Sequence, residues 1–297
     1  MARVKLNVIG CGRVGRVLVR AWHVAGVVEP GWIMNRSLES AEQAVAFIGA
    51  GRAVGRPEAA DDELLMVAVP DGTFEALADA LGLSAPLADR AFHVSGAVSA
   101  EVLRPLARRV ASVHPVCPFA DPETAQQRLA GCWAVAEGDE ALVDELLPLF
   151  DRLGMRTLVA SLADKRLYHA GTIAASNFLT VTAALACDLL VHSGLEAARA
   201  REIVVSLMRS ALDNVQALGP VQALTGPVER GDVAAVNRIV EALGALDGGQ
   251  RRLFVALVGG AAELAERKLG PDRRPAVKMI ELMERVSESA GGARGGL

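Results

Sequence analysis

The chain has few cysteines, and they lie far apart. Four occur in 297 residues, at positions 11, 117, 132 and 187, and no two form a C-x-x-C pair. Zinc centres and small disulfide scaffolds both need closely spaced cysteines. The sequence therefore predicts reduced thiols of the cytosolic kind and no metal centre.

An excess of positive charge is also absent. Lys and Arg number 31 against 35 Asp and Glu, which gives a formal net charge of −4. A weakly acidic chain has no general electrostatic attraction for nucleic acid or for an anionic membrane. Any anionic ligand must be bound locally, by a few well-placed groups.

Long apolar runs and a secretory signal are missing as well. No uninterrupted apolar stretch reaches the length that spans a bilayer. Glycines break the first apolar run, which therefore serves as a strand and not as a signal peptide. We expect a cytoplasmic protein without a nucleic-acid or membrane partner. Its length of 297 residues and its 52% hydrophobic content suit two domains with a large core.

The most informative motif stands near the N-terminus. The strand-like run Val4–Ile9 leads directly into G-x-G-x-x-G at residues 10–15, which a helical pattern follows. This order is the context that a dinucleotide-binding fingerprint requires. The first glycine allows the tight turn, the second lets backbone approach a pyrophosphate, and the third lets the helix pack on the sheet. Alternatively, the turn is glycine-rich and binds nothing. The predicted cofactor-binding residues are Gly10, Cys11, Gly12, Arg13, Val14 and Gly15.

The end of the second expected strand bears on the choice of cofactor. Folds that bind NAD place an Asp or Glu about 20 residues past the glycines, where it accepts hydrogen bonds from the ribose. Here the chain reads Asn35-Arg36-Ser37. No carboxylate would repel a 2′-phosphate, and Arg36 can form charge-assisted hydrogen bonds to one. The sequence therefore predicts NADP(H) over NAD(H), with Asn35, Arg36 and Ser37 as contacts, although Arg36 could also be an ordinary exposed arginine.

Short strands and helices alternate through the first half of the chain. Strand-like runs at 4–9, 31–34, 62–70, 91–96, 110–114, 132–135 and 156–159 alternate with helical patterns at 14–28, 40–48, 73–81 and 140–153. This alternation is typical of an α/β fold with a doubly wound, mostly parallel sheet. We expect an NADP-binding Rossmann-like domain over residues 1–160.

The pattern changes near residue 160. Alanine- and leucine-rich helical segments follow at 163–193, 196–218, 232–245 and 248–270. They predict an all-α substrate and dimerisation domain over residues 161–289. The glycine-rich end, 290–297, is expected to be disordered.

Several polar residues follow the expected strands of the first domain. Ligands of open α/β sheets bind beyond the carboxyl ends of the strands. Val69 and Pro70 would pass beside the cofactor, and Ser95–Gly96 would offer a hydroxyl and backbone N–H groups to a substrate carboxylate. His114 could hold a substrate oxygen or move a proton, or it could be a structural histidine that caps its strand.

A polar stripe opens the helical half. Lys165, His169, Thr172 or Ile173, and Ser176 with Asn177 recur at helical spacing and so share one face. A lysine can donate a proton to the oxygen that becomes negative during carbonyl reduction. We therefore expect Lys165, Asn177, His169 and His114 as catalytic candidates, and Ser95, Gly96 and Ser176 as substrate contacts. The alternative is a solvated first helical turn.

A second polar turn lies at Leu224–Asp232. Its glycines, proline and charged residues form a shaped connection between two helices. Thr225 or Arg230 could close over a substrate, or Asp232 could simply cap the next helix. Thr225 is retained as a substrate-binding candidate.

Taken together, these stretches resemble a family of oxidoreductases known from sequence. It joins an N-terminal Rossmann-like domain to a C-terminal domain of unknown function 2520. The resemblance spans nearly the whole chain and rests on Gly10–Gly15, His93–Ala97, His114–Pro115 with Pro118–Ala120, Lys165–Asn177 and Leu224–Asp232. The wider group resembles ketopantoate reductases, 6-phosphogluconate and β-hydroxyacid dehydrogenases, and pyrroline-carboxylate reductases. Those enzymes place the active site between the two domains.

The resemblance implies roles for individual residues. Lys165 resembles the catalytic lysine that begins the interdomain helix of ketopantoate and β-hydroxyacid enzymes. Ser95–Gly96 resembles the substrate loop of the β-hydroxyacid group, and His114–Pro115 resembles a step found in prephenate dehydrogenases. The chain departs from the pattern at His169, where the β-hydroxyacid enzymes prefer Asn, and Glu229 does not clearly match the glutamate of ketopantoate reductases.

The function that the resemblance implies is reduction of a small keto acid by NADPH. 2-Dehydropantoate (ketopantoate) is the best single candidate, and the product would be pantoate. Two alternatives stay open: a non-catalytic dinucleotide-binding regulatory protein, and a prephenate- or imine-type dehydrogenase. Because related folds dimerise through the helical half, a homodimer is expected.

Overall fold

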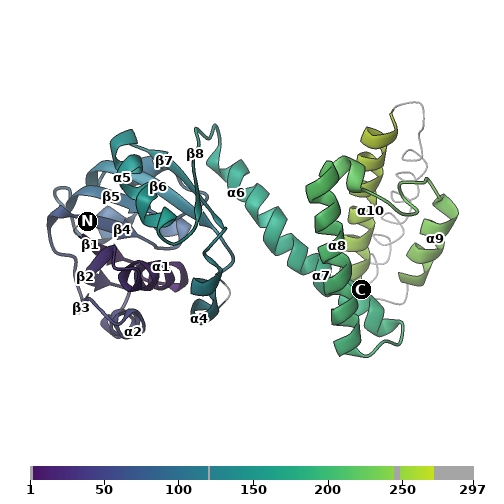
Figure 1. Cartoon of the computed structure of the whole chain (residues 1–297), viewed down its shortest axis with the longest axis horizontal. Helices are drawn as coiled ribbons and strands as arrows, with labels where there is room; N and C mark the ends of the chain where they lie inside the picture. Colours follow the sequence, from purple (N-terminus) through teal and green to yellow (C-terminus); the bar gives the residue numbers. More distant parts are fainter. Residues whose placement is uncertain (1–2, 120, 244–247, 271–297) are drawn as a thin grey trace, which may run out of the picture. The chain divides into compact units, whose positions relative to one another are not determined.

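The computed structural model describes residues 3–119, 121–243 and 248–270 (Figure 1). The chain divides into two compact units, Met1–Phe178 and Leu179–Leu297. The boundary expected at residue 160 therefore falls inside the first unit, because the helix that begins at Lys165 contacts the sheet. The tail expected at 290–297 lies outside the described residues.

The first unit is built on one eight-stranded sheet. Its strands are β1 (Val4–Ile9), β2 (Val28–Met34), β3 (Arg52–Val54), β4 (Ala60–Val67), β5 (Ala88–His93), β6 (Ala107–Val116), β7 (Trp133–Gly138) and β8 (Arg156–Val159). They lie in the order β3-β2-β1-β4-β5-β6-β7-β8. All neighbours are parallel except β6 and β7. The expected doubly wound, mostly parallel sheet is confirmed.

Helices cover both faces of this sheet (Figure 1). They are α1 (Arg13–Val24), α2 (Leu38–Ile48), α3 (Leu77–Ala80), α4 (Pro122–Ala125) and α5 (Glu140–Asp151), joined by the 3₁₀ turns η1 (Asp71–Thr73), η2 (Ala100–Leu103) and η3 (Gln126–Arg128). One face buries Trp22 against Phe92 and Phe150. The other face buries Phe74 and Leu103. These two apolar layers fix the strand ends, where the polar residues of interest lie.

The expected and observed bounds differ for several elements, among them β6 and the helix expected over 73–81. β6 was expected to stop before Pro115 but continues to Val116. Proline lacks an N–H, yet Pro115 faces Ala134 at a position where the β6–β7 ladder needs none. The helix expected over 73–81 is shorter, because η1 and the four residues of α3 replace it.

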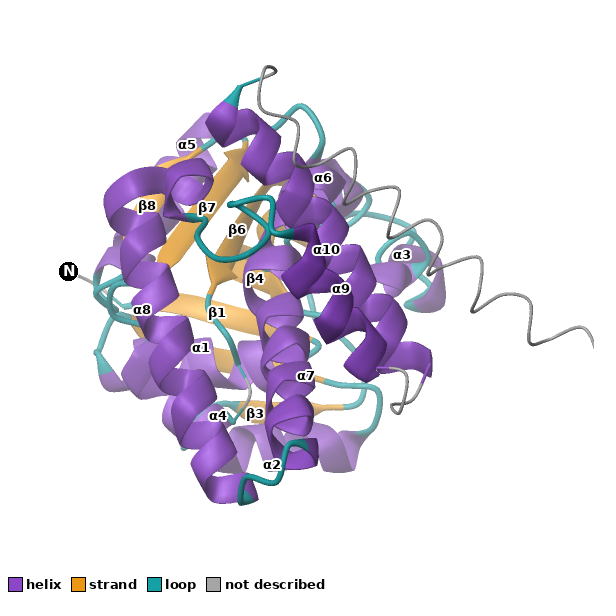
Figure 2. Cartoon of the chain, turned by 90° about the vertical axis from the view of Figure 1, so that its right-hand side faces the viewer, coloured by secondary structure: helices purple, strands orange, loops and turns teal. Residues whose placement is uncertain are grey.

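The second unit is helical, as expected (Figure 2). α7 (Leu179–His192), α8 (Ala197–Ala223), α9 (Val233–Ala242) and α10 (Gly248–Leu269) form it. Val236 and Val240 of α9 pack against Val255 and Val258 of α10. Gly219 has a φ of +74° before Pro220, which kinks α8 near its end.

α6 (Lys165–Ile173) and a π-helical turn (Ala174–Phe178) lead into α7. The continuous segment Lys165–His192 has a mean hydropathy of 1.6 and is the one segment of the described chain that is long and apolar enough to cross a membrane. Its first turns carry Lys165, Tyr168 and His169, which contact polar groups of the first unit. That polar start is unlike the uniformly apolar surface of a membrane span.

Candidate functional site

The glycine turn between β1 and α1 has the geometry that its motif predicts. Gly10 has a φ of +82°, and a Cβ there would lie 2.6 Å from Val69 Cγ1 and 2.9 Å from the Ala68 carbonyl. Gly15 lies close to the turn, because a Cβ there would be 3.3 Å from the Gly10 carbonyl oxygen. Gly10 and Gly15 therefore make the turn compact.

Gly12 differs from its neighbours because the space beside it is open. A Cβ on Gly12 would meet no atom within 4 Å. Gly12 is also the N-cap of α1, which has no side-chain cap and no acidic residue in its first turn. The free N–H groups and the positive end of the helix dipole thus face open space, where a phosphate can bind. This cradle fits a dinucleotide pyrophosphate, and Arg13 is exposed beside it.

The three residues expected to contact a 2′-phosphate have different surroundings. The Asn35 side chain accepts a hydrogen bond from Cys11 N at 2.6 Å and donates to the Ser40 carbonyl at 2.8 Å. Ser37 caps α2 and accepts from Ser40 N at 3.2 Å. Arg36 is exposed and makes no hydrogen bond or ion pair with the residues that the structure describes. Arg36 is therefore the residue whose donors are free for a phosphate.

The β1 and β4 ends lie where the strand order reverses, the point at which such sheets bind dinucleotides. Val69 contacts the Gly10 turn, and Pro70 precedes η1. The carboxyl ends of β5 and β6 lie at the same edge of the sheet, because β5 is parallel to β4 and β6 is parallel to β5. Ser95, Gly96 and His114 therefore belong to this edge.

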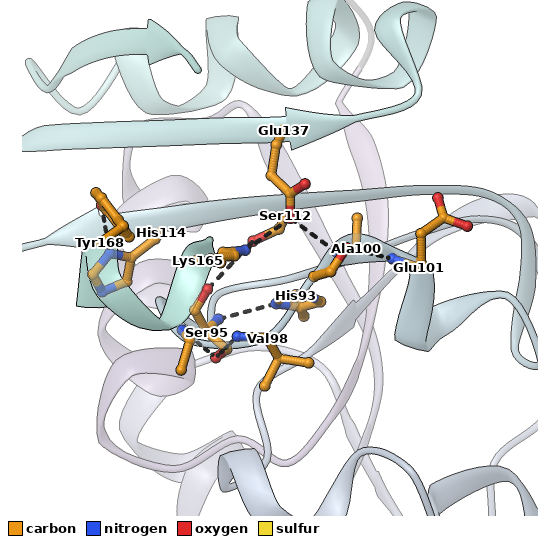
Figure 3. A network of polar contacts seen from close by, with 12 residues as sticks. His93, Ser95, Val98, Ala100, Glu101, Ser112, His114, Glu137, Lys165 and Tyr168 are labelled. Atoms are coloured by element: carbon orange, nitrogen blue, oxygen red, sulfur yellow. Dashed lines mark hydrogen bonds and ion pairs between the residues drawn. The ribbon is translucent and has the colours of Figure 1, made fainter. Parts of the chain in front are cut away.

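Lys165 is the centre of a buried polar network at these strand ends (Figure 3). Its side chain is only 8% exposed. The ammonium donates to Ser112 Oγ and forms an ion pair with Glu137 Oε1 at 3.0 Å. Glu137 also accepts from Ala100 N at 2.9 Å. Ser112 and Glu137 face each other across β6 and β7, so the sheet register itself places both partners of the lysine.

The network continues to the turn after β5. Ser112 Oγ donates to the Ser95 carbonyl at 3.3 Å. Ser95 Oγ accepts hydrogen bonds from Ala97 N and Val98 N, which shape the turn and leave its hydroxyl proton free to donate. Buried His93 accepts from Ser95 N at 3.1 Å through Nδ1. These bonds hold the Ser95–Gly96 turn beside the lysine.

Burial sets the charge states in this network. Desolvation lowers the pKa of Lys165, while the Glu137 carboxylate opposes that shift. Burial, with a smaller contribution from the nearby charge of Lys165, lowers the pKa of His93 to about 3. His93 is therefore neutral near pH 7, whereas Lys165 is a cation with an acidity above that of a solvated lysine.

A second polar cluster of His114, Tyr168 and His169 stands next to Lys165. The His114 Nδ1 and the Tyr168 hydroxyl are 2.8 Å apart, and the rings of His114 and His169 have centroids 5.7 Å apart. A Cβ on Gly96 would collide with His169 Nδ1 and lie 2.9 Å from His114 Nε2. Gly96 thus lets both imidazoles approach the turn after β5.

His114 and Tyr168 are neutral near pH 7. Burial lowers the pKa of His114 to about 4, with the charges of His169 and Lys165 adding to the shift. Burial also raises the pKa of Tyr168 to about 12. A neutral imidazole bound through Nδ1 keeps Nε2 available as a hydrogen-bond donor or acceptor, according to its tautomer.

The remaining candidates are Ser176, Asn177 and Thr225. Ser176 and Asn177 fall in the π-helical turn, where both are exposed and Ser176 Oγ donates to the Thr172 carbonyl at 2.8 Å and to Asn177 Oδ1 at 2.9 Å. Thr225 belongs to the second unit and is exposed. In the same turn Asp232 caps α9 by accepting from Ala235 N at 2.9 Å, which confirms the capping interpretation for that residue.

Sequence reasoning missed Glu137, Ser112 and Tyr168. Glu137 is a charged residue in an otherwise apolar strand, and Tyr168 is the single tyrosine of the chain. These signals mark unusual residues, but they do not say what the residues contact. The register of β6 with β7 and the packing of α6 supply that information.

Two family models match the chain. Residues 1–118 match the Rossmann-like domain, and residues 132–259 match the domain of unknown function 2520 (DUF2520). The resemblance drawn from the sequence is thereby confirmed. A search of the curated proteins finds no match.

Solved structures with the same fold include proteins that bind NADP. The protein TM1727 from Thermotoga maritima is 26% identical, with a TM-score of 0.64 over 89% of this chain and 99% of its own. A candidate NADP oxidoreductase from Bacteroides fragilis is 20% identical, with a TM-score of 0.70 over 88% and 98%. The pyrroline carboxylate reductase of Plasmodium falciparum, solved with NADP bound, is 13% identical, with a TM-score of 0.55 over 93% and 100%. The chain therefore shares its fold with NADP-dependent oxidoreductases.

Proposed function

We propose that this chain, which joins a Rossmann-like domain to a DUF2520 region, is an NADPH-dependent oxidoreductase that reduces a small keto acid. 2-Dehydropantoate is the first substrate to test, with pantoate as its product. The observation that carries the proposal is the buried Lys165 ammonium, which Ser112 and Glu137 hold at the strand ends. A cation in that place suits a reaction in which negative charge develops on a substrate oxygen.

The choice of NADPH rests on the residues that fit it. The open space at Gly12 and the uncapped N-terminus of α1 suit the pyrophosphate. Exposed Arg36 offers charge-assisted hydrogen bonds to a 2′-phosphate. No carboxylate stands at that strand end to repel the phosphate. When bound, NADPH supplies the hydride for the reduction.

Lys165 supplies the electrophilic assistance in this proposal. Two of its three ammonium protons are directed to Ser112 and Glu137, so one remains for a substrate oxygen. Because burial lowers its pKa, the ammonium gives up a proton to a developing alkoxide more readily than a solvated lysine does. Ser95 and Gly96 would hold the substrate carboxylate.

His114 would orient the substrate from the neighbouring strand. Its Nδ1 is bound to the Tyr168 hydroxyl, so Nε2 is directed by that bond. We assign the Nε2 proton to a hydrogen bond with a second oxygen of the keto acid. His169 lies beside it and completes the polar wall next to Gly96.

Reduction of a cyclic imine is the second candidate. The neutral state of His114 favours it, because a neutral imidazole can accept a hydrogen bond from an iminium N–H through Nε2. In that case Lys165 would bind the substrate carboxylate. A panel of keto acids and cyclic imines, followed by NADPH absorbance, separates the two: turnover of imines alone would exclude the keto-acid assignment.

Replacement of Lys165 tests the catalytic part of the proposal. Lys165→Met should lower kcat by about 10²–10⁴-fold while the NADPH Kd stays unchanged. Lys5→Met is the matched control, because Lys5 is an exposed lysine paired with Glu63 away from the strand ends. Since Lys165→Met leaves the Glu137 carboxylate unpaired, the double variant with Glu137→Gln checks that the loss is not one of folding. Full turnover in Lys165→Met and in the double variant would contradict the proposal. So would a wild-type protein that binds NADPH but turns over none of the substrates tested.

The setting of the enzyme is also proposed. We place it in the cytoplasm as a homodimer formed through the second unit. Four free thiols suit a reducing compartment. α7 and α8 expose many large apolar side chains, among them Val181, Ile203, Leu207, Leu212, Val215 and Leu218, which a second copy would cover.

A further inference from the structure

Two of the four cysteines, Cys117 and Cys132, lie at the two ends of the connection between β6 and β7. The antiparallel register pairs Pro115 with Ala134 and Val116 with Trp133. Cys117 directly follows the last paired residue of β6, and Cys132 directly precedes the first paired residue of β7. The cysteines are thus neighbours in space although the sequence separates them, and simple spacing rules do not find such a pair.

Both cysteines lie in turns just outside the paired strands. β6 ends at Val116 and β7 begins at Trp133. The Cys117 N–H donates to the Pro115 carbonyl at 2.9 Å and the Cys132 N–H donates to the Leu129 carbonyl at 3.0 Å.

Their side chains also lie on the same face of the sheet. Residues two apart in a strand share a face, so Cys117 joins Val113 and Cys132 joins Ala134 and Ala136, all of which pack in one core layer. Both sulfurs approach a single acceptor, the Arg128 carbonyl oxygen, at 3.7 Å for Cys117 and 3.1 Å for Cys132. The two side chains also hydrogen-bond to each other, so their sulfurs are close neighbours.

We propose that Cys117 and Cys132 are a redox-active dithiol that forms an intramolecular disulfide with a low-molecular-weight disulfide as oxidant. One cysteine thiolate attacks a sulfur of the small disulfide and releases one small thiol. The second thiolate then attacks the protein sulfur of that mixed disulfide and releases the other small thiol. The protein loses two protons and two electrons in total, and the small disulfide takes up both to become two thiols.

Burial, together with the hydrogen bond to Cys132, raises the pKa of Cys117 to about 12. Cys117 is thus held as a thiol near pH 7, and exchange should be faster at higher pH, where more thiolate forms. Of the other two free cysteines, Cys11 is buried with a pKa raised to about 12, and Cys187 lies in the second unit.

The disulfide would join the two ends of the connection between β6 and β7. That connection contains α4 and η3, which pack on α1, and Glu123 of α4 pairs with Arg20 of α1 at 3.2 Å. Closing a loop of this kind restricts the unfolded chain and stabilises the folded one. Oxidation should therefore raise the Tm of the protein, and reduction should reverse the change.

Peptide mapping of the whole protein tests the proposal. The protein is treated with oxidised glutathione, blocked with N-ethylmaleimide and digested with trypsin without reduction. Cleavage after Arg109, Arg128 and Arg152 should yield peptide 110–128 joined to peptide 129–152, and dithiothreitol should separate them. Cys117→Ser and Cys132→Ser should each abolish the joined peptide, whereas Cys187→Ser should keep it. Separate peptides that carry N-ethylmaleimide or glutathione on each cysteine, with no joined species, would overturn the proposal.

Discussion

At the scale of single residues, the site depends on how one buried cation is paired. Desolvation lowers the pKa of Lys165, since burial disfavours the ammonium. The Glu137 carboxylate at 3.0 Å opposes that shift. We therefore propose Glu137 as a positioning residue, whose effect should appear in the pH dependence of the reaction.

Glu137→Gln should move the high-pH loss of activity to lower pH. Reduction needs protonated Lys165, so kcat/KM falls as the pH rises through the lysine pKa. Because Glu137 raises that pKa, its neutral replacement lowers it and the fall begins earlier. The measurement is kcat/KM against pH for both proteins.

A carboxylate elsewhere on the same unit provides the control. Glu145 lies on α5 and pairs with Arg90 of β5. Glu145→Gln removes that pair and should leave the pH profile unchanged. A Glu137→Gln profile that superimposes on the wild type would show that the pair has no part in proton donation.

Arg36 should decide between the two nicotinamide cofactors. A charge-assisted hydrogen bond contributes about 1.5–3 kcal/mol, so Arg36→Ala should raise the NADPH Kd by roughly 10- to 100-fold and leave the NADH Kd nearly unchanged. Arg108→Ala, an exposed arginine at the amino end of β6, controls for the change in net charge. Equal weakening of both cofactors in a fluorescence titration would remove Arg36 from the 2′-phosphate site.

The residue scale is where sequence reasoning was least complete. Lys165 and His114 could be predicted because they stand at the start of a helix and the end of a strand, places that local pattern reveals. Glu137 and Tyr168 could not, because their importance comes from contacts across the β6–β7 register and from the packing of α6. Asn35 was predicted as a phosphate contact, yet its amide is bound to Cys11 and Ser40.

At the scale of elements, two glycines in the turn between β1 and α1 allow cofactor binding and folding stability to be tested separately. Gly10 and Gly12 differ in conformation: φ is +82° at Gly10 but −76° at Gly12. Any residue tolerates the φ of −76° at Gly12, whereas the φ of +82° at Gly10 favours glycine. The two positions therefore allow a matched pair of substitutions in one turn.

Gly12→Ala should weaken NADPH binding and leave stability intact. Its methyl group would enter open space, with no protein atom within 4 Å. This is the place where the protein backbone approaches the pyrophosphate of a bound dinucleotide. Gly10→Ala should instead lower the Tm, because its Cβ would lie 2.6 Å from Val69 Cγ1 and the positive φ costs roughly 1–3 kcal/mol. Thermal unfolding and NADPH titration of both variants check this. Unaltered NADPH affinity in Gly12→Ala would argue against a pyrophosphate at this turn.

Strong local patterns predicted most elements of the sheet. β1 follows from an apolar run that ends at Gly10, α1 follows from apolar residues at helical spacing, and the alternation of strands and helices predicted the parallel order. Short elements such as β3, α4 and η2 have too few residues to show a period. The length of β6 was underestimated because the effect of Pro115 depends on its partner strand, which the sequence alone does not identify.

At the scale of the whole molecule, the described part of the second unit exposes many large apolar side chains on α7 and α8. On α8, Ile203 and Leu207 stand one turn apart on one face, and both are exposed. Apolar faces of this kind are typical of homodimer interfaces. We therefore expect two copies to associate through α7 and α8.

The mass in solution tests this association. Light scattering should give about twice the chain mass of 31.1 kDa, and Leu207→Glu should return the protein to the monomer mass because a charge would be buried in the interface. Val24→Glu is the matched control, since Val24 on α1 and Leu207 are both 69% exposed. If α1 has no part in the contact, that variant keeps the dimer mass. A wild-type mass of one chain at micromolar concentration would contradict the proposed dimer, while the cofactor and lysine predictions, which concern the first unit alone, would stand.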